Sequence, residues 1–228
     1  SEGKHFEAMG LIERAEASGM NSANLLMRKG VAQFYSKRHF DAVETFDLIL
    51  NQYTKEVKVY FFKGITLLDA GRYQEAVDVL NCAIRVDEQY ADAHHNKGIA
   101  LVKQGRYEEA IAAIDIAIRW DEHYAEFYYD KGVILVEMGR CEEAIGSFNQ
   151  ALGIDERDAS AYHDKGVALS MLGLHADAIR CFSQVIEIEP ERASAYYNKG
   201  FSLAELHRFD EALTCYDCAL QYCTTNAD

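Results

Sequence analysis

Apolar and small residues recur along the chain in two stripes of helical spacing, joined by a short polar turn. In the segment 125–158, the first stripe occupies positions i, i+3, i+4 and i+7, which are Tyr128, Lys131, Gly132 and Leu135. The second stripe follows at Ala144, Phe148, Ala151 and Leu152. Gly139 lies between them and is expected to cap the first helix, while Glu142 and Glu143 favour the N-terminal end of a second helix. The pattern predicts a helix, a tight turn and an antiparallel helix.

This pattern repeats at a fixed interval of 34 residues, which is the signature of a stacked repeat. A Lys-Gly pair marks the period at Lys29-Gly30, Lys63-Gly64, Lys97-Gly98, Lys131-Gly132, Lys165-Gly166 and Lys199-Gly200. We predict six tandem repeats, at residues 23–56, 57–90, 91–124, 125–158, 159–192 and 193–226. Residues 3–15 repeat the second-helix pattern of residues 37–46, so residues 1–22 are predicted to hold the second helix of a truncated repeat and a linker.

The glycines of the repeat require an explanation, because glycine in a helix interior costs about 1 kcal/mol relative to alanine. Close approach of the paired helices supplies one. We expect the approach to occur at the small residues of the second helix, which are Ala42, Ala76, Ala110, Ala144, Ala178 and Ala212.

The order of aromatic, glycine and alanine positions resembles the tetratricopeptide repeat family. One repeat shows it at Gly64, Leu67, Tyr73, Ala76, Leu80 and Ala83, and Pro190 stands where the family commonly has a proline after the second helix. Glu88, Glu122 and Glu156 replace that proline elsewhere, which concerns the turn and not the fold. The resemblance implies an all-α fold: a right-handed superhelical solenoid of antiparallel helix pairs with a concave groove.

Composition and charge narrow the class of partner. With 49% hydrophobic residues, the 228-residue chain can bury a large core. The formal net charge of -14 opposes binding to nucleic acid or to anionic membranes, so we predict neither as a partner. A protein or peptide of neutral or basic character is favoured.

The chain shows no membrane span or signal-peptide pattern, and its six cysteines lack the dense spacing of small secreted scaffolds. We therefore expect a reducing, cytoplasmic setting. The chain begins at Ser1 without a methionine, so a targeting segment upstream is left open. The truncated first repeat suggests either excision from a longer array or ends protected by self-association.

By resemblance, one side of each first helix lines the groove. Two adjacent columns of residues, one residue apart and repeated every 34, form that side, and they alternate rings with amides and carboxylates. We predict that the following residues bind a peptide there: Met27, Lys58, Phe61, Phe62, Asp92, His95, Asn96, Ile99, Glu126, Tyr129, Asp130, Val133, His163, Asp164, Tyr197 and Asn198.

Rings can pack against side chains, amides can hold a peptide backbone, and carboxylates can attract lysine or arginine. The sequence thus favours a protein-interaction scaffold that binds an extended, neutral-to-basic segment in the groove. A subgroup of the family clamps chaperone C-termini with Lys, Arg and Asn, but the equivalent columns here offer only Lys58 and Arg28 as isolated cations. The alternative function is an assembly array or regulatory spacer that associates end to end.

Several reactive residues could indicate other chemistry, but their spacing argues against it. His95 and His163 lie two repeats apart, roughly 20 Å at ordinary helix spacing, so they cannot share one metal ion. His94 is expected in the core, and Cys215 and Cys218 are read as packing residues. The chain has no nucleophile elbow, HExxH sequence or phosphate loop, so we predict no enzymatic activity, metal or cofactor.

The lysine column is the least usual feature, because the family more often has an apolar residue at this position. We expect the stem of Lys97 to cover apolar surface at the edge of the packed stripe, nearly opposite the groove. We expect the ammonium group to reach either water or a carboxylate of the acidic column at Asp87, Asp121, Asp155 and Glu189.

Overall fold

The computed structural model describes residues 23–53 and 55–225, and this part of the chain contains twelve α-helices and no strand. The first helices of the repeats are α2 (Ala23–Tyr35), α4 (Val57–Asp69), α6 (Ala91–Val102), α8 (Ala125–Glu137), α10 (Ala159–Met171) and α12 (Ala193–Glu205). The second helices are α3 (His39–Leu50), α5 (Tyr73–Val86), α7 (Tyr107–Trp120), α9 (Cys141–Ile154), α11 (His175–Ile188) and α13 (Phe209–Thr225). The helix predicted within residues 1–22 lies outside the described residues.

The local signals of the repeat act as the sequence predicts. Each first helix begins at the first residue of a predicted repeat. Gly139 adopts φ 74°, and the backbone N–H of Arg140 donates to the carbonyl of Leu135 at 2.8 Å, which closes the C-terminal end of α8. The all-α helix-pair repeat is confirmed.

The two predicted stripes meet inside each helix pair. Leu135 of α8 is 1% exposed, and Ala144, Phe148 and Ala151 of α9 are fully buried. The core of a repeat is therefore built where the apolar stripe of its first helix packs on that of its second helix.

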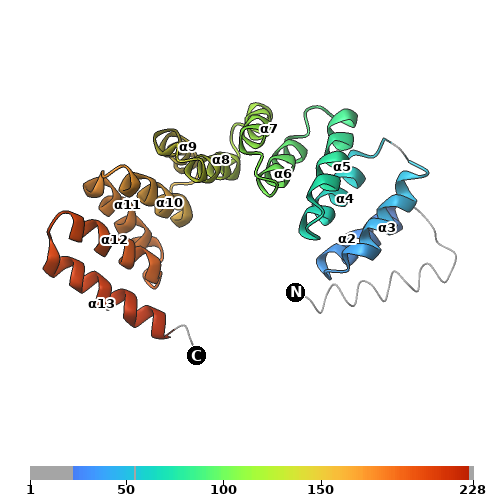
Figure 1. The fold of residues 1–228 in the computed structure, drawn as a ribbon. Helices are drawn as coiled ribbons and strands as arrows, with labels where there is room; N and C mark the ends of the chain where they lie inside the picture. The colour runs from blue at the N-terminus through green and yellow to red at the C-terminus, as the bar shows by residue number, and fades with distance from the viewer. Residues whose placement is uncertain (1–22, 54, 226–228) are drawn as a thin grey trace. The chain divides into compact units, whose positions relative to one another are not determined.

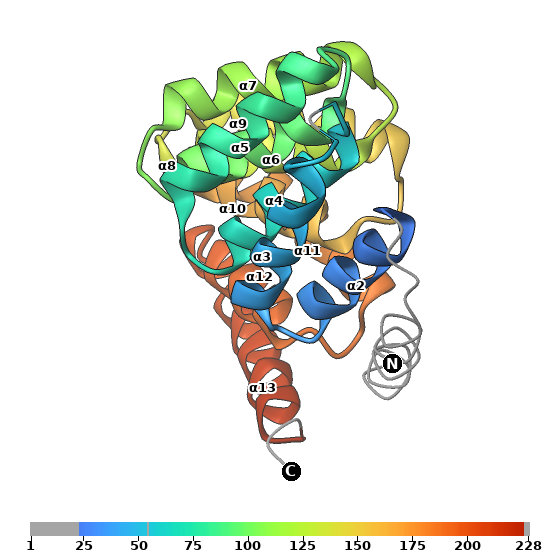
Figure 2. The ribbon, with the colours of Figure 1, turned by 90° about the vertical axis from the view of Figure 1, so that its right-hand side faces the viewer.

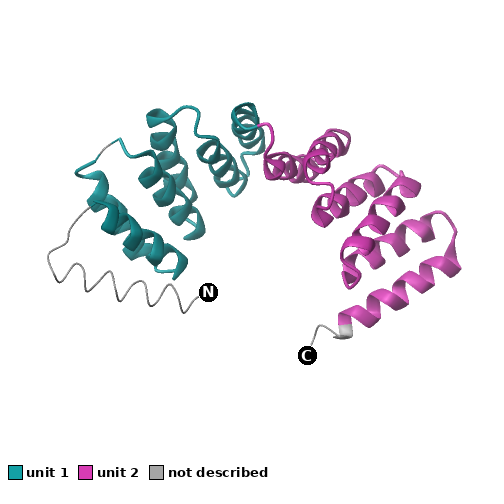
Figure 3. Ribbon diagram, turned by 180° about the vertical axis from the view of Figure 1, so that it is seen from behind, with its two compact units in different colours: residues 1–121 teal, residues 122–228 magenta. Residues whose placement is uncertain are grey.

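The chain divides into two compact units, Ser1–Asp121 and Glu122–Asp228, called unit 1 and unit 2 (Figure 3). The described helices of unit 1 are α2 to α7, and those of unit 2 are α8 to α13 (Figure 1). Within each unit, every helix packs on the next one along the chain, and each first helix also contacts the first helix of the following repeat (Figure 2). This second contact brings residues of consecutive repeats together on the first-helix side.

The helix glycines allow the close approach that the sequence predicts, but the nearest neighbour is a different one. A Cβ atom added to Gly132 would lie 2.5 Å from Cε1 of Phe148, and one added to Gly30 would lie 2.5 Å from the same atom of Phe46. The alanine expected at this contact stands four residues earlier, one helical turn away. These glycines therefore make room for a buried ring. The predicted alanines lie close at two other glycines, because a Cβ atom added to Gly98 would lie 3.1 Å from the backbone oxygen of Ala110, and one added to Gly200 would lie 3.2 Å from that of Ala212.

One lysine of the column pairs with a carboxylate outside the acidic column that the sequence suggests. Nζ of Lys63 lies 2.6 Å from Oδ1 of Asp47, which is on the second helix of the preceding repeat. At Lys97, burial lowers the pKa of the ammonium group, and the nearby carboxylate of Glu109 opposes this shift.

Candidate functional site

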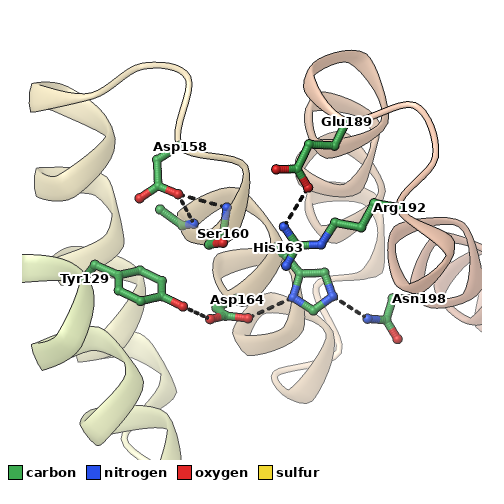
Figure 4. A network of polar contacts seen from close by, with 9 residues as sticks. Tyr129, Asp158, Ser160, His163, Asp164, Glu189, Arg192 and Asn198 are labelled. Carbon is green, nitrogen blue, oxygen red and sulfur yellow. Dashed lines mark hydrogen bonds and ion pairs between the residues drawn. The ribbon is translucent and has the colours of Figure 1, made fainter. Parts of the chain in front are cut away.

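Four residues of the predicted columns form a hydrogen-bonded chain across the first helices of unit 2 (Figure 4). The hydroxyl of Tyr129 in α8 donates to Oδ2 of Asp164 in α10 at 2.8 Å. Oδ1 of Asp164 lies 2.8 Å from Nδ1 of His163, and Nε2 of His163 lies 3.1 Å from Nδ2 of Asn198 in α12. Each interhelical bond joins one column to the adjacent column of the next repeat.

The chemistry of these groups fixes the direction of every bond. A carboxylate only accepts, so Nδ1 of His163 carries the proton and donates to Asp164. Nε2 of the neutral ring is then an acceptor for the amide N–H of Asn198. One neutral tautomer thus satisfies both ring nitrogens, and three consecutive first helices are linked through side chains on one face.

Local structure holds this chain in place. The side chain of Asp158 caps α10 by accepting from the backbone N–H groups of Ser160, at 2.8 Å, and Ala161, at 3.0 Å (Figure 4). Arg192, just before α12, pairs with Glu189 at 3.1 Å. The cap fixes the start of the helix that carries His163 and Asp164.

The electrostatics of this hydrogen-bonded series keep Asp164 ionised and Tyr129 neutral. Burial alone would raise the pKa of the Asp164 carboxyl, but hydrogen bonds from His163 and Tyr129 and the charge of Arg192 outweigh burial, and the pKa is lowered. Burial and the adjacent charge of Asp164 raise the pKa of the Tyr129 hydroxyl. The tyrosine therefore remains a donor at neutral pH.

The predicted column residues of unit 1 pack differently. Met27 and Phe62 are half-buried against a cluster that contains the fully buried Phe46, and Phe61 packs edge-on to Tyr90 with ring centroids 5.3 Å apart. The amide of Asn96 donates to the backbone carbonyl of Asp92 within its own helix, at 2.9 Å. The hydrogen bonds described on this face of unit 1 therefore include no series of linked side chains like the one in unit 2.

The remaining predicted residues differ in exposure. Lys58, Asp92, Glu126 and Tyr197 are exposed, while Ile99, Asp130 and Val133 are partly buried. His95 is only 7% exposed, so it offers little surface to a ligand. His94 is equally buried, as predicted for a core residue, and its Nε2 donates to the carbonyl of Glu88 at 3.0 Å.

Two further observations concern other chemistry. All six cysteines are free thiols, and Cys141 and Cys181 are buried in the helix pairs. Among residues 23–53 and 55–225, no cluster of three or more His, Cys, Asp or Glu side chains is arranged to hold a metal ion.

No helix in that part of the chain is long and apolar enough to cross a membrane.

Comparison with known families agrees with this architecture. Matches to the family described as Tetratricopeptide repeat extend over residues 61–125, 96–161, 129–184 and 193–226, which together exceed half of the chain. The chain belongs to the tetratricopeptide repeat family. No curated protein matches it significantly in sequence.

Solved tetratricopeptide repeat proteins share the fold at low sequence identity. A crystal structure of MamA is 22% identical, with a TM-score of 0.69, and the match covers 72% of this chain and 96% of MamA. MamA from Desulfovibrio magneticus RS-1 is 19% identical, with a TM-score of 0.71, and the match covers 75% of this chain and 97% of that protein. YrrB, described as a TPR protein with an unusual peptide-binding site, is 24% identical, with a TM-score of 0.68, 79% of this chain covered and 93% of YrrB.

These likenesses establish the fold, and membership of the family supports a general role. Tetratricopeptide repeat proteins are generally non-enzymatic scaffolds, and the repeats of this chain support a protein-interaction scaffold.

Sequence reasoning missed one group of residues. A pocket in unit 1 is lined by Arg85, Arg119 and Trp120, all near the C-terminal ends of second helices. Two sequence signals could have found it: the arginines stand 34 residues apart, and Trp120 is the single tryptophan of the chain.

Proposed function

We propose that this tetratricopeptide repeat protein binds an extended, neutral-to-basic peptide segment of a protein partner on the first-helix face of unit 2. This face is the side of α8, α10 and α12 that carries Tyr129, Asp164, His163 and Asn198. The observation that carries the proposal is the hydrogen-bonded chain through these four residues. It orders polar side chains before a ligand arrives, and such preorganisation lowers the entropic cost of binding.

Groups suited to a peptide backbone remain on this face. Asn198 uses one amide hydrogen for His163, so its carbonyl oxygen and second amide hydrogen can pair with one peptide group. Such a pair suits an extended segment, whose backbone donors and acceptors are unpaired.

The same face also favours particular ligand side chains. Tyr197 is 58% exposed, and its ring lies 5.7 Å from that of Tyr216, so it presents a flat surface to an apolar or cationic side chain. Glu126, Asp130 and Asp164 add negative charge, which favours lysine and arginine over acidic residues.

The comparison with YrrB supports the proposal at the level of the fold. The described peptide-binding site belongs to YrrB, and its repeats superpose on most of this chain. A peptide-binding role for this chain is consistent with that likeness and rests on the residues named above.

Selection of a random decapeptide display library on the immobilised chain tests the proposal. Peptides that bind unit 2 should be enriched in lysine and arginine, and their affinity, measured by fluorescence anisotropy, should fall at least tenfold in Asn198→Ala. Asn149→Ala is the matched control, because Asn149 is an exposed amide on the second helix α9. Asp130→Ala should also weaken binding, with Glu142→Ala on α9 as the control for charge. Enrichment of basic peptides that bind all four variants equally would contradict the proposal.

A second candidate function is self-association through α13. This helix exposes Phe209, at 58%, and Leu213, at 61%, and an apolar pocket of about 600 Å³ lies between α12 and α13. Light scattering across a wide concentration range distinguishes the two functions. If the chain self-associates through α13, the mass of the wild type rises with concentration, while the mass of Leu213→Glu stays that of a monomer. A monomer mass at every concentration for both proteins would reject self-association.

A further inference from the structure

A second pocket lies in unit 1, on a part of the repeats that the first-helix face does not include. Its volume is about 470 Å³, and it is bordered by the last turns of α5 and α7 and by the first turn of α6. Ile84, Ile116 and Trp120 form its apolar walls, and the indole of Trp120 is 48% exposed. Pockets of this size and composition accommodate one or two side chains of a ligand.

Two arginines line this pocket without a carboxylate partner. The only described side-chain contact of Arg85 is 2.9 Å from Nη2 to Sγ of Cys82, a weak acceptor. In the described part of the chain, Arg119 makes no ion pair or side-chain hydrogen bond. By contrast, the arginines that precede second helices are paired with a carboxylate three residues later, for example Arg72 with Glu75 and Arg106 with Glu109.

Helix capping does not account for these arginines. A cation in the last turn of a helix is favoured by the helix dipole, and this role alone would explain Arg85 in α5 and Arg119 in α7. In unit 2, however, the equivalent positions of α9 and α11 hold Gly153 and Glu187. All four helices nevertheless end with the same hydrogen bond, from the residue after the helix to the carbonyl four residues earlier, at 2.7 to 3.0 Å. The fold does not require a basic residue there.

The other polar groups of the pocket leave the positive charge of the arginines in place. Glu88 is the acidic residue of the lining, and its described bond is through the backbone carbonyl, which accepts from His94. Burial, aided by the charges of Lys97 and Arg119, lowers the pKa of His94, so the imidazole is neutral at pH 7. The pocket therefore combines two guanidinium groups with an apolar wall.

We propose that this pocket is a second binding site, which takes a short peptide segment with two carboxylates on either side of a bulky apolar side chain. The guanidinium groups of Arg85 and Arg119 bind the carboxylates, and the apolar side chain packs on Trp120. Guanidinium groups bind carboxylates in a bidentate geometry and stack on flat groups, which fits this combination. The two arginines stand on neighbouring second helices, so they suit two separate carboxylates better than one.

The net charge of the chain sets the charge of this ligand. At -14, the protein repels strongly acidic chains over a long range. A segment with only two carboxylates loses little to this repulsion and gains two charge-assisted contacts. The site thus selects a ligand of opposite character to the basic segment proposed for unit 2, and it can be occupied independently.

Trp120 provides a direct readout, because it is the single tryptophan of the chain and lines the pocket. The probe is a capped seven-residue peptide with one leucine between two glutamates, titrated into the full chain while tryptophan fluorescence is followed. We expect a saturable change, and at least tenfold weaker binding when both glutamates are replaced by glutamine. Hexanoate tests whether a free small carboxylate suffices.

Arg85→Gln and Arg119→Gln should each weaken binding about tenfold, whereas Arg72→Gln, which removes a paired arginine at the other end of α5, should not. Circular dichroism establishes that each variant is folded. Equal fluorescence curves for the glutamate and glutamine peptides would overturn the site. Unchanged binding in both pocket variants, or hexanoate binding as tightly as the peptide, would overturn the assignment of the ligand.

Discussion

In unit 1 the column residues Met27, Phe61 and Phe62 pack against the core, whereas in unit 2 the equivalent residues form a hydrogen-bonded chain from Tyr129 to Asn198. The backbone framework is the same in both units: helix pairs of equal type, with a glycine under a large side chain. Packing within the pair is therefore a property of the repeat. The first-helix face contributes less to that packing, and its chemistry is where the two units differ.

The ends of the second helices show the reverse difference. Unit 1 has Arg85 and Arg119 at these positions, and unit 2 has Gly153 and Glu187. Unit 2 thus has a hydrogen-bonded chain on its first-helix face, while unit 1 has two arginines at the ends of second helices that form no ion pair with the residues that the structure describes. Variants that act on the shared framework should affect both units alike, and variants of the polar chain should affect unit 2 alone.

The largest effect is expected from the framework. Gly132→Ala and Gly30→Ala would each place a Cβ 2.5 Å from a fully buried phenylalanine ring, so each should lower the free energy of unfolding by about 2 kcal/mol, measured in urea. Gly146→Ala is the control, because Gly146 is exposed in α9 with open space around it, and this variant should stabilise by about 0.5 to 1 kcal/mol. Unequal costs in the two units would show that the framework is not shared.

The polar chain should matter next. Asp164→Ala leaves the Tyr129 hydroxyl and the Nδ1–H group of His163 partly buried without their acceptor, so we expect a loss of about 1.5 kcal/mol in urea unfolding at pH 7. Asn96→Ala removes the equivalent side chain of unit 1, whose described hydrogen bond is to a carbonyl of its own helix, and should cost no more than about 0.5 kcal/mol. Equal losses would mean that the chain does not stabilise unit 2.

A smaller effect is expected from pH. The folded-state pKa of Asp164 is lowered, so the unfolded state binds its proton first as pH falls. The stabilisation is complete above the ordinary aspartate pKa, roughly 3.9, and is lost as pH falls through the folded value. The difference in unfolding free energy between wild type and Asp164→Asn, measured in urea from pH 5 to pH 3, should therefore shrink toward low pH. A difference that grows toward low pH would contradict the assigned charge state.

The fold was accessible from the sequence because its period is strict, and each first helix begins at a predicted residue. The face was accessible too, since Tyr129, Asp164 and Asn198 share it by helical phase. The hydrogen bonds between these residues could not be predicted from the sequence. Each interhelical bond joins a residue to one 35 positions later, and the distance between stacked helices decides whether the two side chains meet.

Other local partners also required the structure. The large side chain that packs on each repeat glycine, the pairing of Lys63 with Asp47 and the burial of His95 depend on side-chain directions that helical phase gives only coarsely. The pocket at Trp120 required the structure too, because only the side-chain positions show that Arg85 and Arg119 make no ion pair within the described part of the chain.

The central claim is that the first-helix face of unit 2 holds an extended basic segment. The most direct measurement is photo-crosslinking of a library-selected basic peptide that carries one benzophenone residue, followed by mass spectrometry of the crosslinked chain. We predict crosslinks on α8, α10 and α12 near Tyr129, Asp130 and Asn198, which are lost in competition with the unlabelled peptide. Competed crosslinks confined to the second helices, or to unit 1, would contradict the account.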